Sequence, residues 1–152
     1  AILRAVAGAE AADRAECLLA SFPKLEPFFG IFGEADFASA NRDRVRIFWG
    51  KDQAVWDIDE IVKTLAGRPI YVSFDIDGLD GAVMPATGTP TPGGLSYLLA
   101  LAILRRAAEV GSIVGADVVE LAPIPGLHVY DYTAAALAYK IMTYALSGTQ
   151  RR

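Results

Sequence analysis

The sequence has little sulfur and little imidazole. Its 152 residues include one cysteine, Cys17, and one histidine, His128. A single cysteine excludes an internal disulfide, so we expect a protein of a reducing compartment, the cytoplasm. An isolated imidazole without other ligands at a matching spacing seldom binds a metal ion. We therefore expect His128 to be a loop or interface residue.

Clusters of positive charge and long apolar runs are also lacking. Fourteen Lys and Arg residues stand against 18 Asp and Glu residues, and the formal net charge is −4. Nucleic acids and anionic membranes require clustered positive charge, so neither is expected as a partner. The apolar run at residues 95–104 is far shorter than the roughly 20 residues that span a bilayer. Residues 1–4 have neither a basic nor an apolar segment typical of a secretory signal. These absences favour a small-molecule ligand.

What the sequence does contain is enough apolar material for one core. Hydrophobic residues make up 53% of the chain and charged residues 21%, which is typical of a folded protein and not of a disordered one. A chain of 152 residues matches the length of one domain. We therefore predict a single domain over residues 1–152.

Short apolar runs alternate with longer segments of helical spacing along the chain. We predict strands at residues 27–32, 44–49, 70–75 and 112–121. We predict helices at residues 1–22, 55–65 and 95–110, one or two turns at 34–40, and a last helix from Asp131 or Thr133 to about residue 146. Strands that alternate with helices indicate right-handed βαβ units. The predicted fold class is α/β, a three-layer αβα arrangement with a parallel sheet.

Two loops rich in glycine and proline follow predicted strands. Residues 77–94 follow strand 70–75 and contain Gly, Pro, Thr and Asp without any periodicity. Residues 122–130 follow strand 112–121. A long irregular loop inside a compact domain is usually functional. Because ligands of such folds bind at the carboxyl ends of the strands, we expect both loops to border one site.

Two aspartates, Asp75 and Asp77, stand where strand 70–75 ends. Residues two apart in an extended chain face the same side, so the pair presents two carboxylates to one point. Like charges that close repel each other unless a proton or a cation lies between them, and carboxylate oxygens suit manganese or magnesium. The alternative is a set of solvated turn carboxylates that also includes Asp80. The Asp-x-Asp pattern by itself favours that alternative.

The surrounding residues resemble a known family. Residues 73–80, SFDIDGLD, and residues 85–95, PATGTPTPGGL, are similar to the third signature block of the ureohydrolases, which comprise arginase, agmatinase and formimidoylglutamase. Residues 113–123 resemble the next strand of that family, and residues 130–136 resemble its closing helix. The resemblance covers about residues 44–146 and implies an arginase-like fold.

The resemblance also implies roles for individual residues. Asp75 and Asp77 would bind a pair of manganese ions, and Glu120 would pair with the guanidinium group of the substrate. Gly88 and Thr89 would shape the loop around the metals. Two ions about 3.5–4 Å apart lower the pKa of water enough to give a nucleophile that attacks a guanidinium or formimino carbon. Without the resemblance, Glu120 would be taken for a carboxylate that caps a loop.

The chain departs from the family in one major respect. The family builds its metal cluster from two further blocks, one ending in Asp-His and one of the form Asp-x-His-x-Asp, and neither block occurs here. We expect this chain to contribute two carboxylates and not to assemble the dinuclear site alone. It is therefore interpreted as the C-terminal half of a ureohydrolase fold, with residues 1–4 resembling the start of a family helix. The other donors would come from a missing N-terminal half, or the chain would form a homo-oligomer.

The resulting functional hypothesis is a manganese-dependent amidinohydrolase, similar to agmatinase or arginase, that converts a small linear guanidino compound to urea and an amine. Two alternatives stay open: a hydrolase of the formimidoylglutamase type, and a non-catalytic module with a structural or regulatory role. Residues 122–128 are mostly apolar and slightly favour a substrate with an amine tail, such as agmatine.

Overall fold

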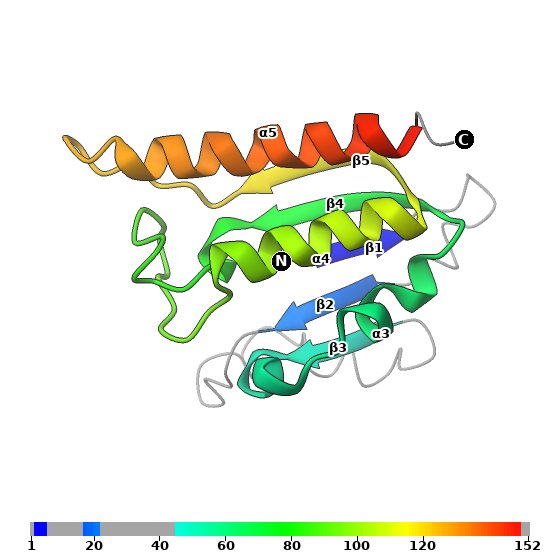
Figure 1. The fold of residues 1–152 in the computed structure, drawn as a ribbon. Helices are drawn as coiled ribbons and strands as arrows, with labels where there is room; N and C mark the ends of the chain where they lie inside the picture. Colours follow the sequence, from blue (N-terminus) through cyan, green and yellow to red (C-terminus); the bar gives the residue numbers. More distant parts are fainter. Residues whose placement is uncertain (1, 6–16, 22–44, 150–152) are drawn as a thin grey trace.

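The computed structural model describes residues 2–5, 17–21 and 45–149 (Figure 1). Within these ranges, five strands form one sheet in the order β3-β2-β1-β4-β5. The strands are β1 (Ile2–Ala5), β2 (Cys17–Ser21), β3 (Val45–Trp49), β4 (Pro69–Asp75) and β5 (Ser112–Val119). The α-helices are α3 (Ile58–Val62), α4 (Tyr97–Val110) and α5 (Val129–Thr149). The 3-10 helices are η2 (Gly50–Val55), η3 (Lys63–Leu65) and η4 (Ile76–Gly78).

The sheet is built mainly from strands that run the same way. β4 pairs with β5 in parallel, and β2 pairs with β3 in parallel. β1 runs antiparallel to both of its neighbours, β2 and β4. The connection β4-α4-β5 is the predicted βαβ unit. The predicted α/β fold is confirmed, with β1 as the one strand of reversed direction among those described.

The helices form one layer on this sheet. α4 contacts both α3 and α5, and α5 also packs against β5 (Figure 1). Right-handed crossovers that advance in one direction along a sheet place their helices on the same face. The described residues thus supply one of the two helix layers of an αβα arrangement. No helix in the described ranges is both long enough and apolar enough to cross a membrane.

β4 shows why the site lies on one side of the sheet. Burial alternates along the strand, so that Ile70, Val72 and Phe74 are buried in the core while the intervening residues are half-buried. The core is completed by α4, whose Ala100, Leu104 and Ala107 are buried. Because side chains alternate in a strand, Tyr71, Ser73 and Asp75 share the other face of β4.

α4 has a clear start in the sequence. The Ser96 side chain accepts a hydrogen bond from the Leu99 backbone N–H at 3.1 Å, which is the usual N-cap arrangement. The predicted helix 95–110 is therefore confirmed, two residues shorter at its start. The last helix, α5, begins at Val129, before the predicted Asp131 or Thr133. Its outward side exposes Tyr132, Tyr139, Met142 and Leu146.

The helix predicted for residues 1–22 is wrong where the structure describes these residues. Ile2–Ala5 and Cys17–Ser21 are strands, and Cys17 lies in β2. The resemblance of residues 1–4 to the start of a family helix is likewise wrong. Local helix propensity is a weak guide that tertiary context overrides, and here Ile2–Ala5 pairs with β4. The strand predicted at 27–32 and the turns at 34–40 lie outside the described residues.

The helix predicted for residues 55–65 is broken into pieces. α3 covers five residues after the N-cap Asp57, and 3-10 turns precede and follow it. Val55, the first residue of the predicted helix, lies in a 3-10 turn and is 83% exposed. Gly67 ends this region: its φ is +72°, and its N–H donates to the Val110 carbonyl at 2.8 Å.

Candidate metal centre

The two predicted metal-binding aspartates lie together at the carboxyl end of β4. Asp75 is the last residue of the strand, and Asp77 follows within η4. The Asp75 carboxylate accepts a hydrogen bond from the Asp77 backbone N–H at 3.2 Å. Ile76 between them is fully buried and anchors the turn in the core. The local fold thus holds the two carboxylates side by side.

Thr89, in the loop at residues 77–94, contacts this pair. Its Oγ1 donates to Asp77 Oδ2 at 2.5 Å, across twelve residues of sequence. This bond fits the predicted role of Thr89 in shaping the loop. No contact supports the same role for Gly88, because a Cβ added there would have nothing within 4 Å. The described structure gives no steric reason for a glycine at position 88.

The environment of the pair raises the pKa of one of its two carboxyl groups. Burial raises the pKa of the Asp75 carboxyl from its ordinary value of 3.8 to about 6, and the hydrogen-bonding and negative charge of Asp77 add to the rise. The hydrogen bond from the Asp77 backbone N–H lowers the pKa of Asp75. Within the described ranges, no ion pair involves Asp75 or Asp77. Two adjacent oxygen donors with no ion-pair partner among the described residues fit a hard divalent cation such as manganese.

Glu120 lies just beyond the end of the neighbouring strand. Asp75 is paired with Val119 in the β4–β5 register, so Glu120 follows directly on the residue opposite Asp75. Glu120 is exposed, and its φ of +65° is in the left-handed region. That conformation costs a residue other than glycine roughly 1–2 kcal/mol. Strain of this kind clusters at functional sites.

The turn at Glu120 brings the two predicted loops together. Leu121 forms an antiparallel bridge with Thr87, and the Ala122 N–H donates to the Ala86 carbonyl at 2.9 Å. The loop after β4 and the loop after β5 therefore meet at the carboxyl ends of both strands. The prediction that both loops border one region is confirmed.

Asp80 has a role that the sequence interpretation missed. Its carboxylate accepts hydrogen bonds from the Ala82 N–H at 2.8 Å and from the Gly93 N–H at 2.7 Å. Asp80 therefore closes the loop at its base instead of facing solvent as a free turn carboxylate. Gly94 next to this closure has no space for a side chain, since a Cβ would lie 2.6 Å from the Leu79 carbonyl carbon. The Gly93–Gly94 pair was the available signal in the sequence.

His128 lies in the loop before α5, as expected of a loop residue. Its Nδ1 is 3.2 Å from Asp131 Oδ2, and its side chain is 84% exposed. In the part of the chain that the structure describes, no group of three or more His, Cys, Asp or Glu side chains is placed to hold a metal ion.

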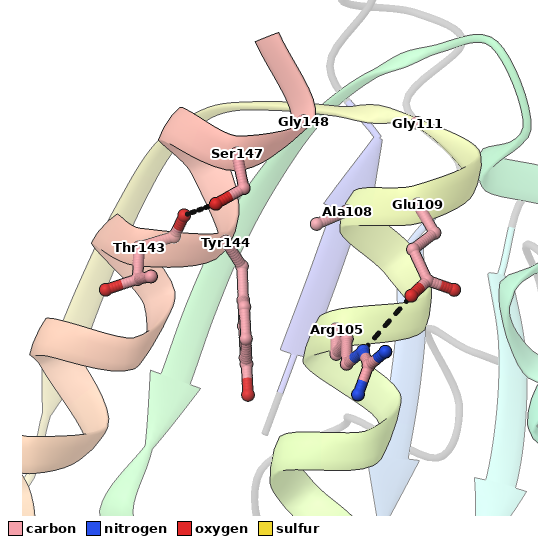
Figure 2. A pocket seen from close by; sticks show the side chains of 8 residues that line it. All are labelled: Arg105, Ala108, Glu109, Gly111, Thr143, Tyr144, Ser147 and Gly148. Carbon is pink, nitrogen blue, oxygen red and sulfur yellow. Dashed lines mark hydrogen bonds and ion pairs between the residues drawn. The ribbon is translucent and has the colours of Figure 1, made fainter. Parts of the chain in front are cut away.

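A separate cavity of about 310 Å³ lies between the C-terminal ends of α4 and α5, at the end of the sheet where β5 begins (Figure 2). Its wall includes Arg105 and Glu109, whose side chains form an ion pair at 3.1 Å, and Tyr144 from α5. Gly111, at its rim, immediately precedes β5. None of the predicted site residues lines this cavity, so it is separate from the candidate metal centre.

Comparison with known proteins identifies the family. Residues 32–147 match the model of the Arginase family. This chain belongs to the arginase family. The ureohydrolase resemblance of the sequence is thereby confirmed.

Individual relatives of this arginase-family chain support the family assignment. It is 36% identical over 103 residues to an N(1)-aminopropylagmatine ureohydrolase from Synechocystis sp., covering 66% of this chain and 33% of that protein. It is 51% identical over 76 residues to an agmatinase from Chromobacterium violaceum, covering 49% of this chain and 23% of that protein. The chain thus spans about a third or less of the length of these relatives.

Solved structures show the same fold. A proclavaminate amidino hydrolase from Streptomyces clavuligerus matches with a TM-score of 0.63 and 32% identity, over 71% of this chain and 38% of that one. A hypothetical agmatinase from Burkholderia thailandensis matches with a TM-score of 0.64 and 32% identity, over 74% of this chain and 37% of that one. The predicted arginase-like fold is confirmed as a partial one.

Proposed function

We propose that this chain is part of a manganese-dependent amidinohydrolase that converts a linear guanidino compound to urea and an amine. The observation that carries the proposal is the Asp75–Asp77 pair, held by Thr89 at the end of β4 without a basic neighbour among the described residues. Membership of the arginase family and the agmatinase and ureohydrolase names of the relatives support it. Cytoplasmic location remains a prediction from the single cysteine.

In this proposal Asp75 and Asp77 hold manganese. Their four carboxylate oxygens provide hard donors, although Thr89 already occupies Asp77 Oδ2 with one hydrogen bond. Bound manganese would lower the pKa of water and polarise the guanidinium. Burial raises the pKa of Asp75 and so disfavours its ionised form. A cation bound beside the pair would favour the ionised form and would offset this effect of burial.

Glu120 is proposed to bind the guanidinium. A carboxylate and a planar guanidinium can form two parallel charge-assisted hydrogen bonds, which fix the orientation of the plane as well as its position. Glu120 follows the residue opposite Asp75, and this supports the proposal that a guanidinium bound to Glu120 would lie near the aspartate pair. Such positioning accounts for a large part of the rate gain in enzymes that join two reactants.

The apolar loop after Glu120 favours a substrate with an amine tail over one with an amino-acid head group. Residues 122–128 carry one ionisable side chain, His128, which faces Asp131. A carboxylate on the substrate would require a cationic or hydrogen-bonding partner that this loop does not provide. The names of two relatives, an agmatinase and an aminopropylagmatine ureohydrolase, support the same choice.

The remaining metal donors are proposed to come from the part of the ureohydrolase fold that lies outside these 152 residues. The chain covers 33% of its aminopropylagmatine ureohydrolase relative. β5 forms one edge of the described sheet, and the adjacent α5 exposes Tyr132, Tyr139 and Met142. A strand edge and an apolar helix side next to each other form a surface that an N-terminal half of the fold would cover. Self-association of this chain through that surface is the alternative.

The metal proposal is tested by titrating the chain with Mn²⁺ and recording amide NMR spectra. We expect paramagnetic broadening first at Asp77, Gly78 and Thr89, and its loss in Asp75→Asn and Asp77→Asn. Asp59→Asn is the matched control, because Asp59 is an exposed aspartate whose carboxylate bonds Arg106 away from the pair.

The outcomes are distinct. Broadening that begins elsewhere, or that survives in both variants, would show that Asp75 and Asp77 are not the metal ligands. Urea release from agmatine by this chain alone would contradict the proposal that further donors are needed. We expect no measurable urea release from the chain alone.

A further inference from the structure

A hydrogen-bonded cluster joins β4 to β5 just before the candidate metal centre. Asp117 on β5 lies opposite Ser73 on β4 in the parallel register. Asp117 Oδ1 accepts a hydrogen bond from Ser73 Oγ at 2.7 Å, and Asp117 Oδ2 accepts one from the Tyr71 hydroxyl at 2.9 Å. All three residues are half-buried. The cluster therefore links the side chains of the two strands that end at the predicted site.

This arrangement is unfavourable by the ordinary rules of sheet stability. Aspartate is depleted in strands, and a carboxylate withdrawn from water loses solvation. The backbone ladder already pairs β4 with β5, so the sheet can form without these side-chain bonds. Hydrogen bonds to an ionised carboxylate are short and strong, which makes the link rigid once it exists.

Gly115 makes the cluster possible. The β4–β5 register shifts between Ile70 and Tyr71, which places Gly115 opposite Tyr71. A Cβ at Gly115 would lie 2.9 Å from both Cδ2 and Cε2 of the Tyr71 ring. Glycine weakens the interior of a strand, so its presence here indicates a close approach by a neighbour. The ring of Tyr71 thus lies over β5 and its hydroxyl reaches Asp117.

The cluster is placed to control the spacing of the site. Ser73 is two residues before Asp75 on the same face of β4, and Asp117 is three residues before Glu120 on β5. Resting on the proposed function, we propose that Asp117 is a positioning residue that sets the separation between the Asp75–Asp77 pair and Glu120. Asp117 itself touches neither metal nor substrate in this role.

The test compares the wild-type chain with Asp117→Asn and Ser73→Ala, using Mn²⁺ relaxation of amide resonances. Relaxation falls steeply with distance from the ion, so a displacement of Glu120 relative to the ion changes the relaxation of its amide. We expect the amides of Glu120 and Leu121 to show such a change in Asp117→Asn and a smaller one in Ser73→Ala. Relaxation at Asp77 should match that of the wild-type chain.

A metal-free measurement keeps the test independent of the proposed function. Without Mn²⁺, Asp117→Asn should introduce microsecond-to-millisecond exchange broadening at Glu120 and Leu121, because Asn lacks one of the two acceptor oxygens through which Asp117 ties β5 to β4. Thr143→Ala is the control: it removes a side-chain hydrogen bond of similar length, to the Tyr139 carbonyl at 2.8 Å, at the other end of the molecule.

Each outcome decides one of the two proposals. A wild-type chain with no Mn²⁺ effect at Asp77 overturns the metal proposal, while the metal-free arm still decides the role of Asp117. Glu120 and Leu121 resonances that match wild type in both arms overturn the positioning role. Equal effects in Thr143→Ala would show a general loss of stability and would also overturn it.

Discussion

The two faces of β4 are made by alternate residues of one short strand, but one face packs in the core and the other forms polar contacts. Ile70, Val72 and Phe74 are buried against the helices and form the centre of the core. Tyr71, Ser73 and Asp75 on the other face carry hydroxyls and a carboxylate that bond to β5 and to the turn after β4. The comparison teaches that the apolar face supplies the free energy of folding, which allows the polar face to hold like charges close together.

The largest expected effect comes from the apolar face. Phe74→Ala removes a fully buried aromatic ring and should lower the free energy of unfolding by about 3–5 kcal/mol, measured by urea denaturation. If this variant fails to fold, Phe74→Leu should still fold with a loss of less than about 1.5 kcal/mol. A Phe74→Ala chain as stable as wild type would contradict the assignment of this face to the core.

A smaller change in the free energy of unfolding, of opposite sign, is expected at Glu120, which follows the end of β5. Glu120→Gly removes the strain of a positive φ and should raise the free energy of unfolding by about 1 kcal/mol. It also removes the proposed guanidinium-binding carboxylate. Glu120→Gln is the control, since it keeps the strained side chain and removes only the charge. Equal stability of the two variants in urea denaturation would show that Glu120 is not strained.

The smallest change in the free energy of unfolding is expected at Asp75, which follows Phe74 in the sequence and lies on the polar face of β4. Its pKa is about 6 in the folded chain against an ordinary 3.8, so the stability contributed by the protonated form is lost as the pH rises through about 6. In metal-free chain at about pH 7, Asp75→Asn should therefore unfold at higher urea than wild type. The Asn oxygen can still accept from the Asp77 N–H.

The pH dependence of that variant is the sharper measurement. At about pH 4 the wild-type Asp75 carboxyl is largely protonated, and the difference between the two chains should nearly disappear. A stabilisation by Asp75→Asn that is equal at both pH values would contradict the raised pKa.

Strong local patterns account for what could be predicted. β4 and β5 were each marked by an apolar run and α4 by helical spacing, and Asp75 and Asp77 followed from alternation at the end of β4. The strands at Ile2–Ala5 and Cys17–Ser21 were missed because their local preference is weak and their pairing partners are distant in sequence. The roles of Asp80 and Asp117 were missed for a related reason: each depends on which residue of another segment lies opposite.

The sequence by itself determined the chemical content of this protein: one apolar strand that ends in two aspartates, a long Gly/Pro loop, and a second strand that ends in Glu120. Local periodicity and turn residues suffice for these features, since they depend on neighbours within a few positions. Only the tertiary structure decided that Thr89 reaches Asp77, that Leu121 meets Thr87, and that Asp117 ties Ser73 and Tyr71 together. Those contacts depend on strand register, here including the shift between Ile70 and Tyr71, which packing of the whole sheet sets.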